Sequence, residues 1–133
     1  MINYKIKTAL ISVTNKKKVD FLAEGLSKLG IKIISTGGTA KYLKSKSLDI
    51  IDVKDVTSFP EILDGRVKTL HPKIYGGILN RVNLKKDLRT LKNFDILNID
   101  LVVANLYNFS ETLKSTNDQD QIIESIDIGG PAL

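Results

Sequence analysis

The residues best suited to chemistry gather in the segment Asp64–Pro72, which reads DGRVKTLHP. This segment holds one of the three arginines, the only histidine and one of the three prolines of the chain. In an extended backbone alternate side chains point to the same side, so Arg66 and Lys68 would share one edge. Two neighbouring cations repel each other unless an anion lies between them. The segment therefore predicts a site for an anionic group, and two solvated surface cations are the alternative.

His71 is the second residue of interest in this segment, because it is the only imidazole in the chain. It precedes Pro72, which favours an extended backbone. The chain has no second histidine and no cysteine to complete a transition-metal site with it. We interpret His71 as structural, with a catalytic role as the less favoured alternative.

The turn Thr36-Gly37-Gly38-Thr39 is a candidate phosphate site. It follows an expected strand and opens an expected helix, where backbone N–H groups lack acceptors and the helix dipole favours an anion. The glycines allow close approach and the two hydroxyls add donors. The turn lacks the Walker A and dinucleotide-binding patterns, so it is a weak signal by itself. The alternative is a plain helix start with Thr36 as its cap.

Three further polar segments lie at strand ends or in glycine turns. They are Ser12–Lys16, Asn105–Tyr107 and Asp127–Gly130. A lysine, a tyrosine and an aspartate brought together can relay protons. The alternatives are a core aromatic for Tyr107 and a backbone cap for Asp127.

Alternating strands and helices must position these residues. The hydrophobic pattern predicts strands at Lys7–Val13, Lys32–Ser35, Asp49–Val53 and Ile99–Leu106. It predicts helices at Val19–Leu29, Ala40–Leu48, Ile74–Leu79, Asn83–Asn93 and Phe109–Leu113, and a short helix or turn at Gln121–Ile126. In the helix Asn83–Asn93, Leu84, Leu88 and Leu91 are expected to point inward. One further helical turn is expected through Phe59, Ile62 and Leu63. This order indicates an α/β fold with parallel strands and helices on both faces, whose ligands bind beyond the carboxyl ends of the strands.

Composition narrows the class of protein. The 133 residues, 42% of them apolar, suit one domain with its own core. Absence of cysteine fits a cytoplasmic protein, and neither a signal peptide nor a membrane span is evident. The net charge is +5, but the 17 lysines are spread along the chain. A small anionic substrate therefore suits this balance better than a nucleic acid, which selects clustered basic residues.

Taken together, five segments resemble a known family. In chain order they read ALISVTNKKKV, STGGTAKYL, DVTSFPEILDGRVKTLHPKIYGGIL, VVANLYNF and IDIGGPAL. They closely resemble the cyclohydrolase part of the bifunctional AICAR formyltransferase/IMP cyclohydrolase family, over nearly the whole chain. The resemblance implies a methylglyoxal-synthase-like three-layer sandwich with a mostly parallel sheet and helices on both faces.

The resemblance also implies a reaction and a site. Formyl-AICAR would close to IMP with loss of water, with no metal or organic cofactor. Catalytic residues of the family fall on Lys68, Tyr107 and Asp127, and Lys68 would form an oxyanion hole with the backbone of Ile128 and Gly129. Nucleotide and phosphate contacts fall on Ser12, Thr14, Lys16, Thr36, Gly37, Gly38, Thr39, Arg66, Thr69 and Asn105.

The same resemblance sets expectations about the whole protein. Residues 1–133 would be one cyclohydrolase domain that stops short of a helix carrying a further lysine. The formyltransferase domain, which 10-formyltetrahydrofolate would serve, would be absent, and the intact protein would be a homodimer. Two departures stand out: Thr36 replaces a common serine and Asn108 a common proline. A nucleotide-sensing domain without catalysis, as in carbamoyl phosphate synthetase, is the alternative, and methylglyoxal synthase is a less favoured third.

Overall fold

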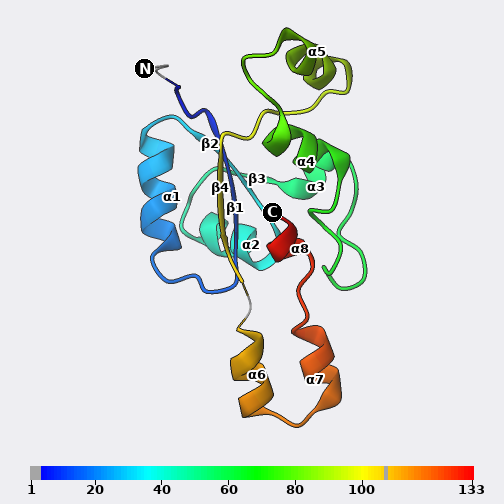
Figure 1. Cartoon of the computed structure of the whole chain (residues 1–133). Helices are drawn as coiled ribbons and strands as arrows, with labels where there is room; N and C mark the ends of the chain where they lie inside the picture. The colour runs from blue at the N-terminus through cyan, green and yellow to red at the C-terminus, as the bar shows by residue number, and fades with distance from the viewer. Residues whose placement is uncertain (1–3, 107) are drawn as a thin grey trace.

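A sheet of parallel strands in the order β3-β2-β1-β4 forms the centre of the molecule (Figure 1). The computed structural model describes residues 4–106 and 108–133. The strands are β1 (Thr8–Val13), β2 (Lys32–Ser35), β3 (Ile50–Asp52) and β4 (Leu101–Asn105). All four pair in parallel, which confirms the expected architecture.

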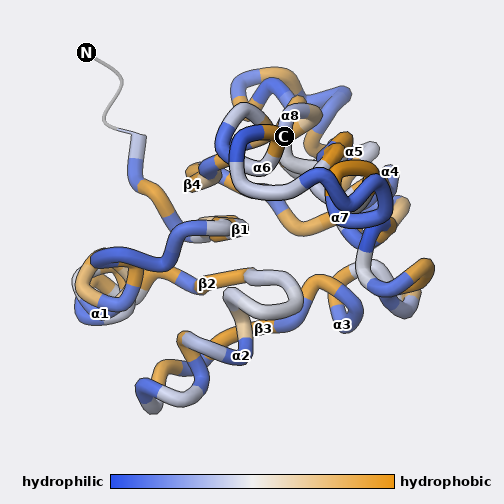
Figure 2. Tube along the Cα trace, turned by 90° about the horizontal axis from the view of Figure 1, so that it is seen from below, coloured by the Kyte–Doolittle hydropathy of each residue, from blue (hydrophilic) through white to orange (hydrophobic). Residues whose placement is uncertain are grey.

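Helices cover both faces of this sheet, as the sequence predicts. Helices α1 (Val19–Lys28) and α2 (Gly37–Ser45) lie on one side of the strands, and α3 (Val53–Thr57) and α4 (Pro72–Leu79) on the other (Figure 2). The alternation of β1 explains this arrangement, because successive side chains point to opposite faces. Ala9 and Ile11 belong to one buried cluster, and Leu10 belongs to the other.

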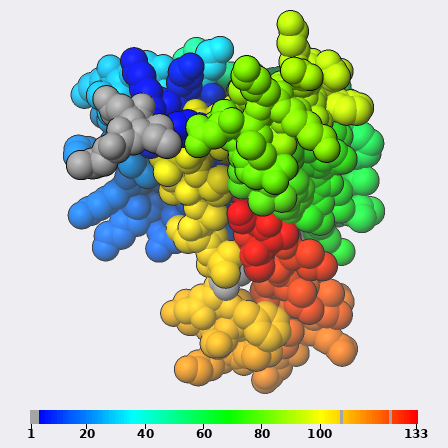
Figure 3. All heavy atoms as spheres, turned by 45° about the horizontal axis from the view of Figure 1, so that its top comes forward, coloured from blue at the N-terminus to red at the C-terminus, as the bar shows by residue number. Residues whose placement is uncertain are grey.

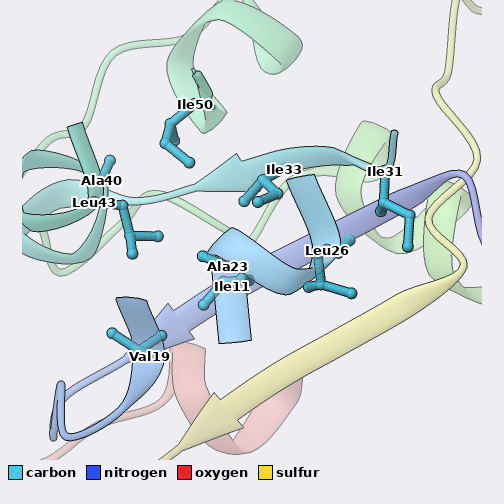
Figure 4. Packing of buried hydrophobic residues seen from close by; sticks show 10 residues of the cluster. Ile11, Val19, Ala23, Leu26, Ile31, Ile33, Ala40, Leu43 and Ile50 are labelled. Atoms are coloured by element: carbon cyan, nitrogen blue, oxygen red, sulfur yellow. The ribbon is translucent and has the colours of Figure 1, made fainter. Parts of the chain in front are cut away.

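The larger cluster packs α1 and α2 against the sheet (Figure 4). Val19, Ala23 and Leu26 recur at helical spacing along α1 and are all buried. They meet Ile11 and Ile33 from the two central strands. This packing fixes α1 and α2 on the sheet, and therefore fixes the loops at the carboxyl ends of β1 and β2.

The prediction for the surface helix α5 (Lys85–Asn93) is only partly correct. Leu91 is buried, but Leu84 and Leu88 are 42% and 45% exposed instead of pointing inward. The helix lies at one end of the molecule, beyond α4, and is not laid along the sheet (Figure 1). It therefore buries little more than its C-terminal turn.

The predicted helical turn through Phe59, Ile62 and Leu63 is wrong. Ile62 and Val67 instead form an antiparallel bridge, with hydrogen bonds in both directions at 3.1 and 3.3 Å. Leu63, Asp64 and Gly65 all have positive φ, which a right-handed helix does not allow. A tight hairpin closed by Ile62 and Val67 therefore replaces the expected helical turn, and Lys68 follows it directly.

The C-terminal part leaves the sheet and then returns to it. Helices α6 (Phe109–Ser115) and α7 (Gln119–Glu124) form a projecting pair beyond β4, and α8 (Gly129–Ala132) comes back beside the sheet (Figure 1). In Figure 3 this last segment, in red, lies between β4 and the region of α4. Leu133 packs against the cluster that contains Leu10 and Ile74. In the part of the chain described, no helix has the length and apolar character needed to cross a membrane.

Candidate functional site

A pocket of about 440 Å³ lies at the carboxyl ends of β1, β2 and β4. The parallel register places Val13 beside Asn105, so the loops after these two strands meet there. All the predicted site residues except two line it: Ser12, Thr14, Lys16, Thr36, Gly38, Thr39, Arg66, Lys68, Thr69, Asn105, Asp127, Ile128 and Gly129. Gly37 lines a neighbouring pocket instead. Tyr107 lies outside the described residues.

Asn105 organises the loop after β1. Its Oδ1 accepts hydrogen bonds from the N–H groups of Thr14 at 2.7 Å and Asn15 at 3.2 Å. Its Nδ2 donates to the Asn15 carbonyl at 2.9 Å. The amide of Asn105 therefore holds the loop that carries Lys16.

The hydroxyls of Ser12, Thr36 and Thr39, which line the pocket, contact one another or the backbone. Thr39 Oγ1 donates to the Val13 carbonyl at 2.8 Å and accepts from the Val13 N–H at 3.2 Å. Ser12 Oγ and Thr36 Oγ1 lie 3.1 Å apart. Thr36 occupies the N-cap position of α2 without a capping bond from its side chain. The hydroxyl of Thr39 thus joins β1 to α2, and those of Ser12 and Thr36 stay at the surface of the pocket.

Helix α2 begins at Gly37, three residues earlier than predicted, so both glycines of the turn belong to its first turn. Lys16 Nζ approaches to 3.9 Å of the point where a side chain on Gly38 would begin. The N–H groups of Gly38 and Thr39 have no acceptor among residues 4–106 and 108–133. An ammonium group and unused N–H groups therefore converge at a helix N-terminus, a combination that suits a phosphate.

The hairpin after α3 forms the opposite wall of the pocket. The Ile62–Val67 bridge closes its base, and Arg66 and Lys68 both line the pocket. Asp64 and Gly65, from the segment predicted to form an anion site, also line it, and the lining residues that the sequence reasoning missed include Leu63 and Ile126. The Asp64-Gly65 dipeptide is a hairpin signal that would have found the turn.

His71 acts as a helix cap in this structure. Its Nδ1 accepts a hydrogen bond from the Lys73 N–H at 3.1 Å, at the start of α4. Its ring lies 6.4 Å from that of Phe59, centroid to centroid. Both contacts agree with the structural role predicted for His71.

Asp127 accepts a backbone hydrogen bond, as expected from the alternative interpretation of this residue as a backbone cap. Its Oδ1 accepts from the Gly130 N–H at 3.0 Å. The N–H groups of Ile128 and Gly129 have no acceptor within the described part of the chain, and both residues line the pocket. The segment therefore offers a carboxylate and two unused donors to the same space, and the catalytic role of Asp127 stays a prediction.

Charge in the pocket favours an anionic ligand. The described lining residues include the cations Lys16, Arg66 and Lys68 and the carboxylates Asp64 and Asp127. The described residues hold no group of three or more histidine, aspartate or glutamate side chains placed to bind a metal ion. The pocket can therefore bind an anion through ammonium, guanidinium and backbone N–H groups.

Comparison with protein families matches this fold. The profile of the MGS-like domain family matches residues 18–132. A solved structure described as "Crystal structure of ForH" superimposes with a TM-score of 0.82 at 35% identity, over 96% of this chain and 65% of that one. The likeness thus extends over nearly all of the chain.

Sequence relatives are considerably longer proteins. The bifunctional purine biosynthesis protein PurH of Caldicellulosiruptor bescii is 53% identical over 128 residues, and that of Elusimicrobium minutum is 50% identical over 131 residues. The PurH of Clostridioides difficile is 53% identical over 127 residues. These matches cover 96–97% of this chain, which spans about a quarter of the relatives' length.

Proposed function

Since the chain belongs to the MGS-like domain family, we propose that it is an IMP cyclohydrolase domain that closes formyl-AICAR to IMP. The carboxamide nitrogen attacks the formyl carbon, a C–N bond forms, and the formyl oxygen leaves as water. No metal or organic cofactor takes part in this step. The relatives are bifunctional purine biosynthesis proteins, which supports a purine nucleotide as the ligand.

The observation that carries this proposal is the convergence of distant segments on one pocket. Lys16, Lys68 and Asp127 come from three parts of the chain and line the same space. A nucleotide 5′-phosphate suits Lys16 and the first turn of α2. Arg66 lies on the facing hairpin, where we assign it to holding the rest of the nucleotide.

Charge stabilisation is the chemistry assigned to the other end of the pocket. Negative charge develops on the formyl oxygen as the nitrogen attacks, and preorganised donors lower that barrier. Lys68 and the N–H groups of Ile128 and Gly129 are the proposed donors. Asp127, with Tyr107, orients the carboxamide and accepts its proton. Because both reacting groups belong to one molecule, the protein mainly selects the conformer that closes.

Formation of IMP from formyl-AICAR tests the proposal directly. We expect turnover by the protein, and a loss of about 100-fold in Lys68→Ala, the usual effect of removing one oxyanion donor. Lys92→Ala, on α5 and outside the residues that line the pocket, is the matched control and keeps its rate. A protein that binds IMP but never forms it would instead be a nucleotide-sensing domain.

The finer properties of the assembly are part of the same proposal. We expect a homodimer in the cytoplasm that binds a small purine nucleotide and neither nucleic acid nor membrane. Light scattering at several protein concentrations measures the oligomeric state. A monomer at all concentrations would contradict the homodimer.

A further inference from the structure

Glu61 places a carboxylate at the N-terminus of α2, although it comes from the loop after α3. Its Oε1 accepts a hydrogen bond from the Gly37 N–H at 3.0 Å. Gly37 is the first residue of α2, where the positive end of the helix dipole favours an anion. A carboxylate of the chain itself therefore takes the first N–H group of the turn that was predicted to bind phosphate.

The Glu61 carboxylate also lies close to the hairpin. A Cβ atom on Gly37 would lie 3.5 Å from Glu61 Oε2 and 3.7 Å from its Oε1, and one on Gly65 would lie 3.5 Å from the same Oε2. Gly65 belongs to the turn of the hairpin that Ile62 and Val67 close. The carboxylate therefore lies between the first turn of α2 and this hairpin.

This location is the boundary between two pockets. Gly38 and Gly65 line both the 440 Å³ pocket and the neighbouring one of about 470 Å³. Lys16 lines only the first pocket, whereas Gly37 and Glu61 line only the second. The first turn of α2 thus borders two spaces, with an ammonium group in one and a carboxylate in the other.

Few backbone donors of this turn are left for a ligand. The Gly37 N–H donates to Glu61, and the Ala40 N–H donates to the Thr36 carbonyl at 3.0 Å. The two N–H groups between them have no acceptor within the described part of the chain. Together with the ammonium group of Lys16 they give donors to one phosphate, and the next donor along the turn is already taken.

A second phosphate would have to continue past Gly38 into the neighbouring pocket, because the ribose and base are assigned to the rest of the first one. The charged residues that line the neighbouring pocket are Lys41, Lys44, Lys54, Lys68, Asp52, Glu61 and Asp64. Lys44 Nζ already lies 2.5 Å from Asp52 Oδ2. Glu61 is the carboxylate bound to the start of α2, so a second phosphate there would meet a like charge that repels it.

We propose that Glu61 makes the site selective for nucleoside monophosphates over diphosphates. It takes the Gly37 N–H that a second phosphate would use, and it sets a negative charge beside the path of that phosphate. Such selectivity comes from repulsion of the wrong ligand and not from added attraction for the right one. The proposal rests on the proposed function, which places the phosphate of a purine nucleotide at α2.

Titration calorimetry with IMP and with inosine diphosphate tests this selectivity. We expect the wild-type protein to bind IMP more tightly than the diphosphate. Glu61→Gln keeps an acceptor for the Gly37 N–H and removes only the charge, so it should reduce this preference at least about 10-fold, chiefly by tightening diphosphate binding. A merely structural defect would instead weaken both ligands together. A wild-type protein without the preference, or the same affinity ratio in Glu61→Gln, would overturn the proposal.

Two controls accompany this titration. Glu24→Gln, which changes an exposed glutamate on α1, keeps the wild-type affinity ratio. An unchanged midpoint of urea unfolding in Glu61→Gln shows that the fold is retained.

The possible failures are distinguishable. A wild-type protein that binds IMP but never forms it contradicts the cyclohydrolase reaction, and the affinity ratio still decides the role of Glu61. A protein that forms IMP but keeps its affinity ratio in Glu61→Gln retains the proposed function and contradicts the role of Glu61. A protein that binds neither nucleotide contradicts both.

Discussion

The carboxylate of Asp127 lies directly over Gly130, whose N–H donates to its Oδ1 at 3.0 Å. A Cβ atom on Gly130 would overlap the Asp127 carboxylate. Glycine is therefore needed at this position for Asp127 to keep its present orientation beside the pocket. A Cβ atom on the neighbouring Gly129 would lie 3.3 Å from Thr69 Oγ1.

Gly130→Ala should impair turnover more than stability. The new methyl group displaces a side chain at its flexible end and no part of the backbone, so Asp127 rotates away. For the proposed formation of IMP we expect kcat to fall roughly 10–100-fold, the range for small misplacements of a catalytic group, which is the role proposed for Asp127. In an Asp127→Ala background the substitution should add little. A full loss in that background would show that Gly130 acts independently of Asp127.

Thr39→Val should destabilise the protein although the side chain keeps its shape. The hydroxyl of Thr39 satisfies both the N–H and the carbonyl of Val13 in a buried setting. Leaving these groups unpaired should cost about 1–3 kcal/mol in the free energy of unfolding, measured in urea. Thr39→Ser keeps the hydroxyl and should lose only about 1 kcal/mol, for one methyl group. Equal losses would argue against the hydrogen bonds.

Gly77→Ala should be among the more damaging glycine substitutions. Gly77, in α4, packs against the segment that leads into β4. A Cβ on Gly77 would overlap the Leu97 carbonyl and lie 3.1 Å from the Ile99 side chain. Because a backbone atom must move, we expect a loss of about 1–3 kcal/mol or more in unfolding free energy. Gly25→Ala on α1 meets nothing within 4 Å and should instead stabilise by about 0.5–1 kcal/mol.

Asp100 should make stability depend on acid pH. Burial acts to raise the pKa of Asp100, but hydrogen bonds from Tyr4 and from the N–H groups of Lys7 and Thr8 outweigh it and lower this pKa. A lowered pKa in the folded state means that the contribution is complete above the unfolded pKa of about 4. It is lost as pH falls through the folded value.

Asp100→Asn tests this linkage. Charge-assisted bonds to backbone N–H groups are the stronger kind, so we expect about 1–2 kcal/mol less unfolding free energy at pH 7. The difference from wild type should shrink toward pH 2. Asp95→Asn, whose carboxylate is fully exposed and 3.5 Å from Lys73 Nζ, should change stability by less than about 0.5 kcal/mol. A pH-independent difference for Asp100→Asn would contradict the argument.

Local pattern was enough to predict most elements. Apolar residues at helical spacing located α1, and nearly continuous apolar runs located β1 and β2, because burial on a sheet requires them. The pattern failed between Phe59 and Leu63, where Phe59 precedes a hairpin and Ile62 and Leu63 belong to it. Phe59, Ile62 and Leu63 are all exposed, so burial of apolar side chains does not stabilise a helix there.

The sequence by itself determined which turns are candidates for anion binding, because glycines, hydroxyls and lysines would act there through local backbone geometry. Only the tertiary structure decided which backbone N–H groups of those turns are hydrogen-bonded to distant side chains. Glu61 reaches Gly37 across 24 residues, and Asn105 reaches Thr14 across 91. Such partners depend on the order of strands in the sheet and on how loops pack. No short-range periodicity in the sequence encodes that order. The hydrogen bond from the Gly37 N–H to Glu61 could therefore be found only in the folded chain.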